Sequence, residues 1–109
     1  MSEYIPDKWV VVKIGDTDLY KVFACWYGGY AGSDSWKLNS GIASVVKEGY
    51  CFDFTGYSGS VYSCHSDTYG TNMYGMSVLN NFIEKAAKNG VTITVMPEDT
   101  DFLTLNYGE

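Results

Sequence analysis

The chain contains no arginine: its seven basic residues are all lysines, and they are set against 13 acidic residues, for a formal net charge of -6 at pH 7. Arginine supplies the planar fork that grips phosphates and guanine edges, and nucleic-acid binding draws its affinity from a basic surface. The composition therefore argues against sequence-specific binding of DNA or RNA. An acidic surface serves solubility, or attracts the basic face of another protein.

Long apolar runs are also missing. No stretch approaches the roughly 20 consecutive apolar residues that a membrane-spanning helix needs, and the first residues resemble neither a signal peptide nor a basic transit peptide. The three cysteines, Cys25, Cys51 and Cys64, lack the Cys-x-x-Cys spacing of structural zinc sites, and their odd number fits reduced thiols. We therefore expect a cytosolic protein without metal or cofactor.

Histidine occurs once, as His65, directly after Cys64. Neighbours on a strand point to opposite faces, so these two side chains do not form a nucleophile and base pair. The sequence predicts no catalytic residue. One alternative stays open, in which Cys25 or Cys51 reaches His65 from another strand.

Alternating apolar residues predict a β-rich chain that forms one domain over residues 1–109. The expected order is a hairpin over residues 8–26, a three-stranded meander ending near residue 65, a helix over about 72–89 and a strand over 91–95. Residues 102–107 are a further candidate edge strand. The predicted fold class is α+β, with an antiparallel sheet of about five or six strands and one amphipathic helix packed on one face. A closed barrel plugged by the helix is the alternative.

Two local patterns make this expectation specific. The helix should bury a single stripe at three- and four-residue spacing, and Thr71 or Asn72 should cap its start. The stripe consists of Met76, Leu79, Phe82, Ile83 and Ala86. A two-residue turn at Tyr57 and Ser58 would place Cys51 opposite Cys64 and Tyr50 beside His65.

Aromatic residues and glycine are abundant, with ten Tyr, five Phe, three Trp and 12 Gly. Many of them gather in the longest irregular segment, which follows the first hairpin. Rings, hydroxyls and loop amides together can stack a flat purine-sized ring and bind its phosphates. The candidate ligand-binding residues are Trp26, Tyr27, Gly28, Gly29, Tyr30, Ser33, Asp34, Ser35, Trp36 and Lys37. The alternative is an ordered surface loop whose tryptophans anchor it to the core.

Residues 20–24, 28–30, 35–42 and 54–62 resemble small acidic accessory proteins of tailed bacteriophages, most specifically in the Ser-Trp-Lys-Leu-Asn-Ser-Gly run at residues 35–41. The resemblance transfers no catalytic residue. It implies a counter-defence protein that acts in the host bacterial cytosol by binding and blocking a component of bacterial immunity.

Three functional hypotheses follow. The first is a non-catalytic protein that sequesters a nucleotide-derived immune signal in the aromatic and glycine-rich loop, with a pocket that a homo-oligomer would build between its subunits. The second is an acidic protein–protein inhibitor of a host nuclease or another defence protein, with Tyr and Trp as anchors. The third is a small hydrolase of a nucleotide signal that acts through His65 and nearby carboxylates.

Overall fold

The computed structural model describes residues 3–28 and 32–108. It confirms the α+β class, with eight strands and one α-helix. The elements follow in the order β1 (Glu3–Tyr4), β2 (Lys8–Ile14), β3 (Tyr20–Trp26), β4 (Ser35–Leu38), β5 (Ile42–Glu48), β6 (Cys51–Gly56), β7 (Val61–His65), the 3-10 helix η1 (Ser66–Thr68), α1 (Met73–Lys88) and β8 (Ile93–Val95).

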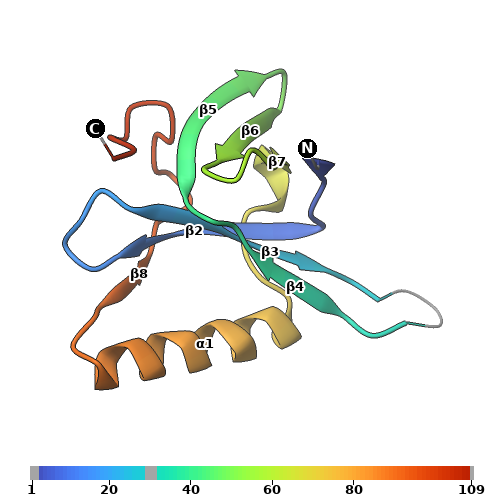
Figure 1. Ribbon diagram of the computed structural model, residues 1–109. Helices are drawn as coiled ribbons and strands as arrows, with labels where there is room; N and C mark the ends of the chain where they lie inside the picture. The colour runs from blue at the N-terminus through green and yellow to red at the C-terminus, as the bar shows by residue number, and fades with distance from the viewer. Residues whose placement is uncertain (1–2, 29–31, 109) are drawn as a thin grey trace.

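The strands form two four-stranded sheets, whereas the sequence predicted a single sheet or a barrel. The central sheet has the strand order β4-β3-β2-β8, and the outer sheet has the order β1-β7-β6-β5. Figure 1 shows three layers, with the outer sheet on one side of the central sheet and α1 on the other. The Cα radius of gyration, 13.5 Å, is close to the roughly 13 Å of a compact chain of this length.

The third layer follows from the apolar run in β2. Val11 packs in the core between the two sheets, whereas Val10 and Val12 pack in the core between the central sheet and α1. A strand whose successive residues are all apolar needs cover on both faces, because its side chains alternate between them. Strands β5, β6 and β7 therefore form a separate sheet, which covers the second face of the first hairpin.

Helix α1 agrees with the prediction to within one residue at each end. Asn72 caps it, since its Oδ1 accepts a hydrogen bond of 2.6 Å from the Gly75 amide. Leu79 is buried against the central sheet, but Met76, expected in the same stripe, is 55% exposed. No helix in the described parts of the chain has the length and apolar character to cross a membrane.

The register predicted for the β6–β7 hairpin is wrong by one residue. The Gly56 amide donates to the Ser60 carbonyl at 2.8 Å, and Gly59 has a φ of +94°. The connection is thus a three-residue loop with glycine in the left-handed region, not a two-residue turn. Cys51 pairs with His65 instead of Cys64, so the two thiols lie on opposite faces of the sheet.

Two further differences concern the ends of the chain. Strand β1 pairs in parallel with β7, which the sequence analysis did not predict. The edge strand expected over residues 102–107 does not form, and the segment is irregular. Instead Phe102 is only 2% exposed and packs into the core between the sheets, while the Tyr107 hydroxyl donates to the Phe102 carbonyl at 2.5 Å.

Candidate binding site

The two tryptophans of the predicted loop site lie on opposite faces of the central sheet. Trp36 pairs with Cys25 on the face covered by α1, and its ring lies 5.8 Å from Phe23 and 5.2 Å from Phe82, centroid to centroid. Trp26 pairs with Ser35 on the other face. Because neighbouring strand positions point in opposite directions, these two indoles do not enclose one ligand.

Several side chains and amides of the predicted ligand-binding set form hydrogen bonds within the protein. Trp26 Nε1 donates to the Ile5 carbonyl at 2.9 Å, and the Tyr27 amide donates to Asp7 Oδ2 at 2.8 Å. Asp34 accepts from the Gly28 amide at 2.9 Å. Tyr27, Ser33, Ser35 and Lys37 are exposed, and the Lys37 ammonium lies 5.2 Å from the centroid of the Tyr4 ring. Gly29 and Tyr30 lie outside the described residues.

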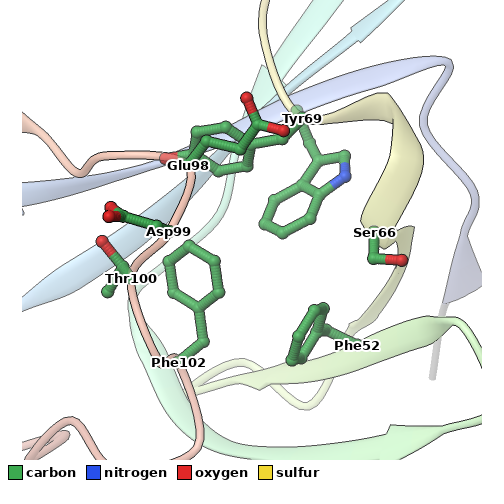
Figure 2. Close-up of a pocket in the computed structure, with 8 residues that line it drawn as sticks. Phe52, Ser66, Tyr69, Glu98, Asp99, Thr100 and Phe102 are labelled. Atoms are coloured by element: carbon green, nitrogen blue, oxygen red, sulfur yellow. The ribbon is translucent and has the colours of Figure 1, made fainter.

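A cavity of about 220 Å³ opens elsewhere, between the outer sheet and the segment that follows β8. In Figure 2 the rings of Phe52 and Phe102 face a common open space, with Glu98, Asp99 and Thr100 along one side of it. Trp9 and Phe102 form the buried floor, and the half-buried Phe52 and Tyr69 form walls. The lining residues are Trp9, Phe52, Ser66, Tyr69, Glu98, Asp99, Thr100 and Phe102.

Hydrogen bonds and ring contacts hold these aromatic walls in place. Trp9 Nε1 donates to the His65 carbonyl at 2.8 Å. The Tyr69 hydroxyl donates to the Met96 carbonyl at 2.5 Å and accepts from the Val11 amide at 3.2 Å. The Trp9 and Tyr69 centroids are 4.8 Å apart in an edge-on arrangement. With both polar atoms occupied, the two side chains present apolar ring surface to the cavity.

The acidic side of the cavity has no cation of its own. Among residues 3–28 and 32–108, no Lys ammonium lies within 4.0 Å of a carboxylate, and the one contact of a basic side chain at that range joins Asp67 to His65, which is charged only when protonated. Neither Glu98 nor Asp99 is paired. Burial, and to a smaller extent the Glu98 carboxylate, raise the pKa of Tyr69. No group of three His, Cys, Asp or Glu side chains in these residues is arranged to hold a metal ion.

A second cavity, of about 380 Å³, adjoins the first and shares Tyr69 and Glu98 with it. It lies between α1 and strands β2 and β8, and its lining is mainly aliphatic. The lining residues are Val10, Tyr69, Gly70, Thr71, Met76, Leu79, Asn80, Ile83, Val95 and Glu98. Met76 borders this cavity, which accounts for its exposure.

His65 has the stacking partner expected from the sequence, with the Tyr50 ring 5.9 Å away and inclined by 25°. Its Nδ1 accepts the Asp67 amide proton at 3.1 Å and caps η1. Cys51 lies directly across the strand pair. With Nδ1 occupied as an acceptor, the ring proton is on Nε2, and the imidazole has no free lone pair to take a proton from Cys51.

The two other thiols are buried. Burial, with a smaller contribution from Asp53, raises the pKa of the Cys64 thiol far above its ordinary value. Burial likewise raises the pKa of Cys25. Since the thiolate is the reactive form, neither residue is suited to nucleophilic chemistry.

Comparison with known protein families, curated proteins and solved structures finds no match for this chain.

Sequence reasoning did not identify the residues that line the aromatic cavity. Trp9, Phe52, Tyr69 and Phe102 are separated by 17 to 43 positions and appear in the sequence as ordinary core residues. One local signal was available, namely the acidic run at residues 98–101 directly before Phe102. Carboxylates next to a large apolar residue indicate a segment that exposes charge and is held to the core by the apolar side chain.

Proposed function

We propose that this protein is a non-catalytic binding protein that engages a positively charged segment of another protein. The observation that carries the proposal is the aromatic cavity, with the unpaired Glu98 and Asp99 at its side, on a chain of net charge -6. Aromatic faces and carboxylates both attract cations, and aromatic pockets are typical anchoring points of protein interfaces. Of the three hypotheses, this geometry favours the acidic protein–protein inhibitor of a host nuclease or defence protein.

The same cavity is poorly suited to a nucleotide. A phosphate would meet two unpaired carboxylates, and like charges at short range repel. The sequestration of a nucleotide-derived signal therefore remains a prediction about the segment 26–37, where Lys37 is the nearby cation. The occupied Nδ1 of His65 speaks against the hydrolase hypothesis.

The test is binding of fluorescent 12-residue peptides, followed by anisotropy. One peptide is rich in Lys and Arg, and its neutral counterpart carries Gln at those positions. We expect saturable binding of the basic peptide alone, weakening several-fold between 50 and 300 mM NaCl as charge screening increases. The double variant Glu98→Gln/Asp99→Asn should lose about tenfold in affinity, which corresponds to about 1.4 kcal/mol.

A matched control removes the same charge elsewhere. Asp16 and Glu84 are exposed, in the β2–β3 turn and on α1, and neither lines a described cavity. The variant Asp16→Asn/Glu84→Gln should bind like the original protein. Equal losses in both double variants would mean that net charge alone attracts the peptide, and the proposal would be wrong.

A parallel experiment tests the nucleotide hypothesis. The protein is incubated with cyclic oligonucleotides or ADP-ribose derivatives and heat-denatured, and the released ligand is assayed. We expect none to be retained. Recovery of intact ligand would favour sequestration over our proposal, and recovery of an altered ligand would identify an enzyme.

A further inference from the structure

Four aromatic rings line the first cavity. Its four rings come from four separate segments, and the Phe52 and Phe102 centroids lie 5.6 Å apart with the rings nearly perpendicular. Tyr69 and Phe102 lie 5.7 Å apart and are inclined by 33°. The rings contact one another, and the half-buried Phe52 and Tyr69 are the two that expose surface on which a planar cation can stack.

Residues 1–109 cannot supply a guanidinium themselves. They include no arginine, so neither this copy nor a second copy can place a guanidinium in the cavity. The nearest ring-bound cation is Lys47, whose ammonium lies 5.3 Å from the Phe52 centroid. Lys47 is exposed on the edge strand β5 and does not line the cavity. A guanidinium in this cavity would therefore come from outside residues 1–109.

We infer that the cavity binds the guanidinium group of an arginine side chain on the partner protein. This inference rests on the proposed function and specifies its anchoring group. A guanidinium is flat and weakly hydrated, so it stacks on ring faces at lower desolvation cost than an ammonium. Its five donors can also serve more than one acceptor, and the cavity lining offers the carboxylates of Glu98 and Asp99, whereas an ammonium acts as a single compact charge.

The experiment titrates the isotope-labelled protein with N-acetyl-arginine amide and follows the tryptophan indole N–H signals by NMR. Trp9 lines the cavity, whereas Trp26 and Trp36 lie outside it and serve as internal references. The indole signals are assigned with Trp→Phe variants. We expect a saturable shift of the Trp9 signal alone, with a millimolar dissociation constant, and a loss of at least about fivefold in Glu98→Gln.

Two matched probes test the chemistry. N-acetyl-citrulline amide has nearly the same shape as the arginine probe without its charge, and it should cause no saturable shift. N-acetyl-lysine amide has the charge without the planar group, and it should bind at least about fivefold more weakly than arginine. In Lys47→Met, which removes the ammonium beside Phe52, arginine should bind at least as well as in the original protein.

The outcomes separate this inference from the proposed function. If lysine binds as tightly as arginine, or if citrulline binds equally well, the guanidinium assignment is wrong even where basic peptides still require Glu98 and Asp99. If Trp9 does not respond to arginine but those peptides still bind, the assignment again fails and the proposed function survives. If the basic peptides do not bind either, both are wrong.

Discussion

Two regions of this molecule, the described residues of 26–37 and the irregular segment 96–107, organise their aromatic side chains in different ways. The first region extends a hairpin, and its strand ends send Trp26 and Trp36 to different faces of the central sheet. The second has no regular structure, yet it places Phe102 against rings from β2 and β6 and against Tyr69. Trp26 and Trp36 thus do not converge on one cavity, whereas Phe102 meets rings from other segments.

The difference teaches that a high local density of aromatic residues is a poor guide to a binding site. In a strand, alternation divides neighbouring rings between two faces. A cavity needs rings from separate segments to meet, and that depends on how the layers are assembled. Phe102 reaches the cavity from a segment without strand geometry, so the alternation that separates Trp26 from Trp36 does not apply to it.

The largest effect should come from Phe102→Ala. Removing a large buried ring from the core between the sheets should lower the free energy of unfolding by about 3–5 kcal/mol. Chemical denaturation measures this loss. The neighbouring Leu103 is 49% exposed, so Leu103→Ala should change stability by less than about 0.5 kcal/mol. Similar losses in both variants would contradict the anchoring role of Phe102.

A smaller loss should follow Trp36→Ala. This ring contacts Phe23 and Phe82 but remains 36% exposed, so we expect about 1–3 kcal/mol. Binding of basic peptides should be unchanged in protein that is still folded. If residues 26–37 instead sequester a nucleotide, this variant should lose nucleotide binding. Thermal melting, measured beside both binding assays, distinguishes loss of a binding residue from loss of stability.

Alkaline pH should weaken the fold through buried phenols. Burial, with smaller contributions from Tyr4 and Cys64, raises the pKa of Tyr62 from 10.0 to about 12, and burial also raises the pKa of Tyr107 in the C-terminal region. The folded state favours the neutral phenol. The contribution of Tyr62 to the free energy of unfolding is therefore complete below pH 10 and is lost as the pH rises toward 12.

Tyr62→Phe removes one of these ionisable groups. The melting temperature of this variant should fall less between pH 10 and 12 than that of the original protein. Tyr27, which is 55% exposed in the loop region, provides the matched control, and Tyr27→Phe should follow the original pH profile. A profile for Tyr62→Phe that coincides with the original would show that its phenol does not contribute.

The smallest effect should come from His65→Ala, outside both regions. The variant loses the acceptor that caps η1 and the stacking with Tyr50, which together should cost less than about 1 kcal/mol. Binding of basic peptides should persist. A complete loss of biological activity in a folded His65→Ala protein would restore the catalytic hypothesis.

Local patterns in the sequence were sufficient for several elements. The spacing of Leu79, Phe82 and Ile83 predicted α1, and Asn72 was recognised as a possible cap. Patterns that depend on one glycine or on a distant partner were insufficient. The left-handed Gly59 lengthened the loop by one residue and shifted Cys51 from Cys64 to His65. The contact between Tyr50 and His65 formed all the same, because Tyr50 lies just beyond the shifted pair.

The sequence by itself determined the charge of this protein, its α+β class, its single helix and the alternation of its strands, because each of these depends on composition or on residues a few positions apart. Only the tertiary structure decided that the strands divide into two sheets and that Trp9, Phe52, Tyr69 and Phe102 meet beside Glu98 and Asp99. The reason is physical. Hydrophobic burial is non-directional, so an apolar side chain in the sequence does not specify which distant residue it will contact. Those contacts are fixed only when the whole core packs.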